Sequence, residues 1–184
     1  FDNFKFFTIA QINKLKERTL TMNGVSKSYA MTGWRIGYAA GPKNIIAAIR
    51  KIQSQSTSNP SSISQAAAVE ALNGKQSFIK KRAKSFSDRR NFVVNYLNNI
   101  PGITCLMPKG AFYVFPSCKG LIGKKTKIKN DTDFVQKLLE KQNVAVVQGS
   151  AFGLDGYFRI SYATSMRKLK VAMERIKVFC KSLG

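Results

Sequence analysis

The 184-residue sequence predicts an α/β protein in two parts. Near the N-terminus, two short segments with strand character, 19–25 and 35–40, surround a polar turn. A long amphipathic helix is predicted over 77–99, and shorter strands and helices alternate after it. This order indicates the end of an α/β region over 1–74, followed by a compact α+β unit over 75–184.

The first part continues with two predicted helices. Tyr38, on the second strand segment, is expected to be a core aromatic. Pro42 begins the first helix, because proline suits the first helical turn. Its apolar residues recur at helical spacing and are Ile45, Ile46, Ile49 and Ile52. The polar stretch 53–64 interrupts this helix, and a second helix is predicted over 65–72, ended by Asn73-Gly74.

The second part begins where the long helix stops at Pro101-Gly102. Segments 103–107 and 112–115 are predicted as paired strands around the turn Pro108-Lys109-Gly110. The lysine-rich segment 119–130 is predicted as a surface loop.

Two further helices and two strands complete the second part. The helices are predicted over 131–142 and 165–183, and the strands over 144–147 and 157–161. The apolar side chains expected to face the core from these helices are Phe134, Val135, Leu138, Leu139, Leu169, Ala172, Met173, Ile176 and Leu183.

Composition excludes several classes of protein. The longest aliphatic run is about five residues, too short to span a bilayer. Histidine is absent, which excludes a Ser-His or Cys-His nucleophile and any histidine-ligated metal within this chain. The three cysteines lie far apart and match no metal spacing, so we expect reduced thiols in a cytoplasmic protein and no metal site. Because the chain begins at Phe1, we expect a fragment.

The net charge is unusual, at +22 from 31 Lys+Arg against 9 Asp+Glu. Such a balance is typical of nucleic-acid binding, but also of a lysine-rich proteome or of a fragment separated from an acidic remainder. One cationic cluster comprises Lys80, Lys81, Arg82, Lys84, Arg89 and Arg90, and the other lies within 124–129. We interpret them as a solvated helix face and a solvated loop, which makes specific nucleic-acid binding the less favoured hypothesis.

The stretch GVSKSYAMTGWRIGY carries the strongest chemical signal. Lys27 follows a strand in a serine-rich turn, and Arg35 lies eight residues further on. A shielded lysine amine readily loses its proton and forms Schiff bases. The guanidinium fork matches phosphate oxygens, and Ser26 adds a hydroxyl donor. Gly33 and Gly37 let the backbone approach a ligand closely. The pattern predicts a site for an aldehyde cofactor that bears a phosphate.

Four strings extend this signal along the chain: SKSYAMTGWRIGY, NPSSISQAAAVEAL, KGAFYVFP and YFRISYATS. In this order they resemble segments of the class I, fold type I pyridoxal-phosphate-dependent aminotransferases, and of the bacterial aspartate aminotransferases in particular. The resemblance covers nearly the entire chain. It implies the C-terminal part of such an enzyme: the end of the large cofactor-binding domain over 1–74, and the small α+β domain over 75–184.

The resemblance also implies roles for single residues. Lys27 would form the Schiff base with pyridoxal 5′-phosphate and carry the proton during transamination. Arg35 and Ser26 would bind the cofactor phosphate. Arg159 would bind the substrate α-carboxylate through its bidentate fork. Without the family, Arg159 would be interpreted as a surface arginine at a strand end.

Parts of the family's machinery have no match in this chain. They include the aspartate that pairs with the pyridine nitrogen, since only Asp2 and Glu17 are acidic before Lys27 and neither lies in the expected motif. Gly24 stands where some relatives carry a phosphate-binding serine. We therefore expect this chain alone to bind cofactor poorly and to be inactive.

The resemblance implies amino-acid and 2-oxo-acid substrates and a homodimer. Some aspartate aminotransferases bind the distal carboxylate of the substrate through an arginine of the NP region, but no arginine occurs between Arg50 and Arg82 here. The chain therefore more closely resembles the bacterial branch of the family. We expect aspartate with 2-oxoglutarate as substrates, with glutamate and prephenate left open. Two alternatives remain: another pyridoxal-dependent enzyme on the same scaffold, and a basic, non-enzymatic nucleic-acid-binding module.

Overall fold

The computed structural model describes residues 1–183, which form two compact units. The N-terminal unit comprises Asn3–Lys81, and the C-terminal unit comprises Phe1–Asp2 together with the chain from Arg82 onward. This division falls seven residues after the predicted boundary at 74/75. The assignment of the two units to the large and small domains of an aminotransferase stays a prediction.

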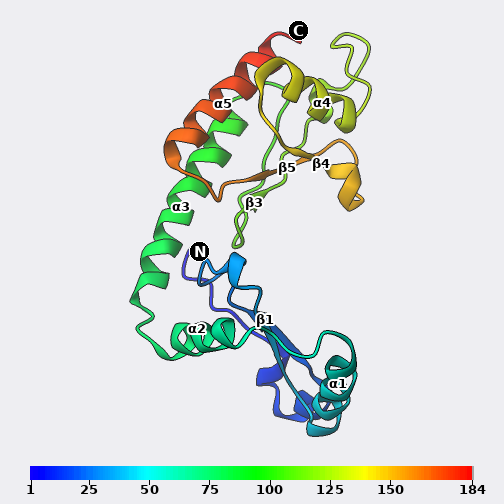
Figure 1. The fold of residues 1–184 in the computed structure, drawn as a ribbon. Helices are drawn as coiled ribbons and strands as arrows, with labels where there is room; N and C mark the ends of the chain where they lie inside the picture. The colour runs from blue at the N-terminus through cyan, green and yellow to red at the C-terminus, as the bar shows by residue number, and fades with distance from the viewer. Residues whose placement is uncertain (184) are drawn as a thin grey trace. The chain divides into compact units, whose positions relative to one another are not determined.

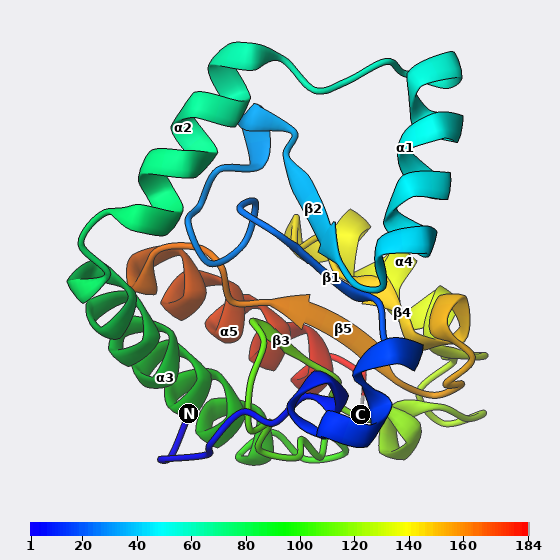
Figure 2. The same cartoon turned by 90° about the horizontal axis from the view of Figure 1, so that it is seen from below.

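The N-terminal unit contains one hairpin and two helices (Figures 1 and 2). Strands β1 (Thr21–Gly24) and β2 (Gly37–Ala40) pair antiparallel, from Thr21 opposite Ala40 to Gly24 opposite Gly37. The helices are α1 (Lys43–Ser56), with Pro42 as its N-cap, and α2 (Ser62–Asn73). The 3-10 turns η1 (Ile9–Gln11) and η2 (Asn13–Arg18) precede the hairpin. All four predicted elements are confirmed, with shifted ends.

The core of the N-terminal unit is small. Its buried hydrophobic residues are Val25, Ile36 and Ala68. Helix α1 buries no residue, and Ile52 on its predicted apolar face is 71% exposed. The expectation that Tyr38 lies in a core is wrong, since its side chain is 41% exposed. The reason is that β1 and β2 form a two-stranded ribbon, which buries too little area to enclose its aromatic side chains.

The long predicted helix is α3 (Ser77–Asn98), which crosses the division between the units. Its buried residues include Val93, Val94 and Leu97, as the predicted stripe requires. The interpretation of Arg90 as part of a solvated helix face is wrong. Arg90 lies on the buried stripe of α3 and is only 2% exposed.

The C-terminal unit is built on a three-stranded antiparallel sheet in the order β3-β5-β4. The strands are β3 (Tyr113–Val114), β4 (Val147–Gln148) and β5 (Phe158–Ser161). Helices α4 (Asp131–Gln142) and α5 (Met166–Lys181) follow the predicted ranges closely. Helices α3 and α5 lie side by side in both views (Figures 1 and 2), and the Tyr96 hydroxyl of α3 bonds to Glu174 of α5.

One large hydrophobic core joins α3, α4, α5 and the sheet. At its centre the ring of Phe134 lies 5.0 Å from that of Phe158 and 5.4 Å from that of Phe179, measured between centroids. Leu139 was predicted to face inward, but it is 48% exposed. It lies one position beyond the buried Leu138, a rotation of about 100° around the helix axis.

The predicted pairing of 103–107 with 112–115 is wrong. Thr104 forms an isolated antiparallel bridge with Ser117, and β3 pairs instead with β5. The backbone of Cys105 bonds to the side-chain amide of Asn98, which satisfies the polar groups that a hairpin would have paired. In the predicted loop 119–130 the lysines beyond the turn η4 (Lys119–Leu121) are exposed as expected.

No helix within residues 1–183 combines the length and apolar character that crossing a bilayer requires.

Candidate functional site

The end of the β1-β2 hairpin brings together three of the predicted site residues. The Val25 N–H donates to the Ile36 carbonyl at 3.4 Å, which extends the ladder by one pair beyond the strands. Ser26 directly follows Val25, and Arg35 directly precedes Ile36. Ser26 and Arg35 therefore leave the ladder at the same end, with Lys27 next in the turn.

The turn that carries Lys27 is fixed by its own backbone. The Lys27 carbonyl accepts from the Ala30 N–H at 3.1 Å, and the buried Val25 accepts through its carbonyl from Tyr29 at 3.3 Å and Met31 at 3.4 Å. The Tyr29 hydroxyl donates to Gln76, and its ring meets the edge of Phe78 at 6.0 Å. The turn is thus tied to the first residues around α3, while the Lys27 side chain is exposed.

Arg35 has an unusual backbone conformation. Its φ of 53° and ψ of 46° lie in the left-handed region, which costs a non-glycine residue on the order of 1 kcal/mol. One guanidinium nitrogen, Nη1, donates to the Thr32 carbonyl at 2.8 Å. That bond holds the guanidinium of the exposed Arg35 beside the turn.

The donor set at this end of the hairpin fits an aldehyde cofactor with a phosphate. A primary amine, a hydroxyl and a guanidinium occur within ten residues and at one end of one ladder. An arginine fork and a hydroxyl match phosphate oxygens, and a lysine amine can form a Schiff base with an aldehyde.

Arg159, the fourth predicted site residue, lies on β5 at the centre of the other unit's sheet. Along β5 the buried Phe158 and Ile160 alternate with Arg159 and Ser161, so Arg159 projects from the face opposite the core. Tyr113 of β3 is paired with Ser161 and shares this face. Tyr113 is thus the diagonal cross-strand neighbour of Arg159, a spacing that long side chains bridge.

The guanidinium of Arg159 lies over two aromatic rings. Its central carbon is 4.4 Å from the centroid of Tyr113 and 4.3 Å from that of Phe152. Within residues 1–183 the structure records these two cation–π contacts, but no hydrogen bond or ion pair to the guanidinium. Its N–H donors therefore have no protein partner among these residues, and a carboxylate is an anion that they can bind.

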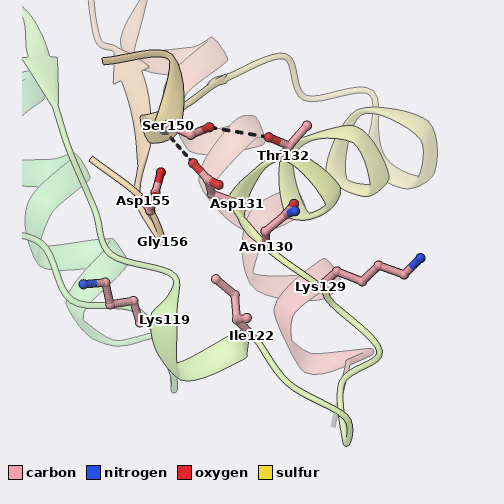
Figure 3. A pocket seen from close by; sticks show the side chains of 9 residues that line it. All are labelled: Lys119, Ile122, Lys129, Asn130, Asp131, Thr132, Ser150, Asp155 and Gly156. Carbon is pink, nitrogen blue, oxygen red and sulfur yellow. Dashed lines mark hydrogen bonds between the residues drawn. The ribbon is translucent and has the colours of Figure 1, made fainter. Parts of the chain in front are cut away.

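A polar pocket in the C-terminal unit is lined by residues that hold the turn before Phe152 (Figure 3). The buried Asp131 carboxylate accepts from the Ser150 N–H at 2.7 Å, and Thr132 contacts the Ser150 hydroxyl at 3.5 Å. The amines of Lys119 and Lys129 extend in opposite directions, away from each other. The Asp131–Ser150 bond fixes η5 (Gly149–Phe152), the turn that ends in Phe152.

Sequence reasoning missed Tyr113 and Phe152 as neighbours of Arg159. The string KGAFYVFP contains Tyr113, but the predicted hairpin assigned this segment to the wrong partner strand. Only the β3-β5 register places Tyr113 beside Arg159. The available signal would have been the aromatic residues in the two segments that precede the predicted strand of Arg159.

Comparison with known proteins assigns the family. The sequence matches the family described as aminotransferase class I and II over residues 1–176. The chain therefore belongs to the class I and II aminotransferases, a family that uses pyridoxal phosphate.

Within this family the similar proteins include bacterial aspartate aminotransferases. The chain is 60% identical over 189 aligned positions to the aspartate aminotransferase of Rhizobium meliloti strain 1021, covering all of this chain and 46% of the relative. It is 57% identical to a probable aspartate/prephenate aminotransferase of Rickettsia typhi, covering 100% of the chain and 47% of the relative. The chain thus spans about half the length of the curated relatives it matches.

Solved structures agree with this fold. The crystal structure of the Rhizobium meliloti aspartate aminotransferase matches with a TM-score of 0.96 and 59% identity, over all of this chain and 47% of that one. An aromatic aminotransferase from Pyrococcus horikoshii matches with a TM-score of 0.89 and 39% identity, over 99% of this chain and 48% of that one. The nucleic-acid-binding alternative rests on net charge alone and receives no support from these matches.

Proposed function

We propose that this chain is the part of an aspartate aminotransferase that carries the cofactor lysine and the arginine for the substrate carboxylate. The observation that carries the proposal is the position of Lys27, Ser26 and Arg35 at one end of a single hairpin. Arg159 adds a second line of support, since the N–H donors of its guanidinium have no hydrogen-bond partner within residues 1–183. The whole-chain similarity to aspartate aminotransferases agrees with both.

Each residue has a definite task in this proposal. The Lys27 amine binds the cofactor aldehyde and afterwards takes and returns the proton at the substrate Cα. Arg35 and Ser26 hold the phosphate. Arg159 holds the α-carboxylate bidentately and so fixes the orientation of Cα, which is a large part of the rate. Bound pyridoxal phosphate supplies the electron sink for the bond cleavage.

The substrates belong to the same proposal. Aspartate is the amino donor that we propose, because a relative 60% identical to this chain is named an aspartate aminotransferase. The acceptor that we propose with it is 2-oxoglutarate. Prephenate is an alternative acceptor, named for the relative from Rickettsia typhi. A homodimer that shares its active sites between subunits is also part of the proposal.

Chemical trapping of the cofactor tests the proposal. The complete protein, loaded with pyridoxal phosphate, is reduced with borohydride, digested and examined by mass spectrometry. We expect the reduced cofactor on Lys27, and its loss in Lys27→Ala. Lys51→Ala is the matched control, since Lys51 is an exposed lysine of α1 in the same unit, and its adduct yield should equal that of the parent.

Two other outcomes of this experiment would contradict the assignment of Lys27. A cofactor adduct spread over several lysines, or one retained by Lys27→Ala, would remove Lys27 from the mechanism. Repeating the experiment on the 184-residue chain measures how much of the site forms without further protein, and we expect a much lower yield there.

A further inference from the structure

The contacts of Arg159 continue outward through further aromatic rings. The guanidinium carbon lies over the Tyr113 ring at 4.4 Å and over the Phe152 ring at 4.3 Å, measured to the ring centroids. Behind Tyr113 lies Phe112, with ring centroids 4.3 Å apart. Behind Phe152 lies Phe115, which meets it edge-on at 5.5 Å and 88°. The arginine thus contacts two aromatic rings, each of which contacts a further ring.

Phe152 is the less expected of the two rings. Its side chain is 46% exposed, so burial does not account for its position. The η5 turn places it there, and that turn is held by the Asp131–Ser150 bond and by the Gly149 N–H, which donates to the Tyr157 carbonyl at 2.7 Å. Gly153 ends the turn with a φ of 74°, a conformation that suits glycine. Local structure thus directs an exposed ring onto a cation.

Close contact with two rings has a geometric consequence. A guanidinium interacts with aromatic rings through its faces and forms hydrogen bonds in its plane. Two rings at 4.4 and 4.3 Å restrict rotation of the group and keep water from the sides that they contact. A planar carboxylate that approaches in this plane meets two parallel N–H donors in fixed positions. A fixed donor pair loses less entropy on binding than a mobile one.

We infer that Tyr113 and Phe152 are positioning residues that fix the plane of the Arg159 guanidinium for bidentate binding of the substrate α-carboxylate. This inference rests on the proposed function, since it takes Arg159 as the carboxylate-binding residue. It adds that recognition depends on the two aromatic faces as well as on the charge.

A pair of ligands that differ by one carboxylate isolates this effect. 2-Methylaspartate carries the α-carboxylate but no proton on Cα, so it binds without transamination. 3-Aminobutanoate is the same molecule without the α-carboxylate. In the complete protein with pyridoxal phosphate bound, the dissociation constant of each ligand is measured from the change in cofactor absorbance. The dissociation constant of 3-aminobutanoate divided by that of 2-methylaspartate then reports the α-carboxylate interaction.

We expect Tyr113→Leu and Phe152→Leu each to reduce this ratio by about tenfold, within the range of a desolvated cation–π contact. Tyr113→Phe and Phe152→Tyr keep the ring faces and should stay within about twofold of the parent. Tyr96→Leu is the matched control, because it removes a ring that lies 5.8 Å from the Lys177 amine elsewhere in the same unit. Its ratio should equal that of the parent.

A second readout needs no cofactor. Protons above an aromatic face are shielded, so the side-chain resonances of Arg159 should be shifted upfield in the parent and in the two ring-keeping variants. Each leucine variant should lose part of this shift. Because Phe152 is partly exposed, Phe152→Leu should leave the fold intact and keep this comparison interpretable.

Arg159→Lys separates the two proposals, since it keeps the charge but removes the fork. If Arg159→Lys abolishes the discrimination while both leucine variants retain it, the positioning role is wrong and the proposed function stands. If the parent protein itself does not discriminate between the two ligands, the assignment of Arg159 fails and the positioning role fails with it.

Discussion

The Arg90 guanidinium binds both carboxylate oxygens of Asp2, at 2.7 Å from Nη1 to Oδ2 and at 2.8 Å from Nη2 to Oδ1. Nη1 also donates to the Pro108 carbonyl at 2.8 Å, and the ring of Phe1 lies 4.7 Å from the guanidinium carbon. Arg90 is almost fully buried, whereas the Asp2 side chain is 58% exposed. A buried arginine is therefore neutralised by a residue 88 positions away in the sequence.

This pair predicts a pH-dependent stability. The hydrogen bond from Arg90 lowers the pKa of Asp2. Because the folded pKa lies below the unfolded one, the stabilisation is complete above the ordinary aspartate pKa of ~3.9 and is lost as the pH falls through the folded pKa. Asp2→Asn should lower the urea midpoint at neutral pH, and the difference should shrink below about pH 4.

Asp88→Asn provides the control for this measurement. Asp88 pairs with Lys84 at 3.6 Å on the exposed side of the same helix, and such surface pairs contribute little. Its urea midpoint should match that of the parent at every pH. An equal loss in both variants would show that net charge, not the buried pair, governs the stability.

Gly149 is expected to tolerate no side chain. A Cβ at this position would lie 2.2 Å from the Leu154 carbonyl oxygen and 2.8 Å from that of Tyr157. Gly149→Ala should therefore destabilise the C-terminal unit by about 1–3 kcal/mol and displace the turn that carries Phe152. Urea unfolding measures the loss. Gly110→Ala, where no atom lies within 4 Å of the added carbon, should change the free energy of unfolding by less than about 0.5 kcal/mol.

The three thiols are expected to be unreactive in the folded protein. Burial raises the pKa of Cys105 to about 11, and burial raises those of Cys118 and Cys180 to about 12. Each unit of pKa reduces the thiolate fraction about tenfold at a given pH, and the thiolate is the reactive form. Alkylation at pH 8 should be slow in buffer and fast in urea. Rapid labelling of Cys118 in buffer would contradict the burial described for it.

The two units should differ in stability when the 184-residue chain is studied alone. The C-terminal unit has an extended core, whereas the N-terminal unit buries only Val25, Ile36 and Ala68. Amide hydrogen exchange should be slow in α3 beyond Arg90, α4 and α5, and fast through α1 and α2. Uniform protection of both units would show that the hairpin region is stable without additional protein.

The sequence by itself determined most of the secondary structure. Helix α4 was predicted with its observed ends from apolar residues that repeat at helical spacing. In the structure the Asn130 side chain caps it and its first turn is acidic, which are also local features. The SKSYAMTGWRIGY string also identified the family, because it combines residue types at fixed spacings that chance seldom produces. Such information is local along the chain, and the sequence displays it directly.

Only the tertiary structure decided which distant residues meet. The register of β3 against β5 places Tyr113 beside Arg159, and the η5 turn brings the Phe152 ring into contact with the same guanidinium. The burial of Arg90 depends on Asp2, far away in the sequence. These contacts depend on strand pairing and packing between segments that lie dozens of residues apart. Local propensity carries no information about such pairings, because many registers satisfy the same hydrophobic pattern.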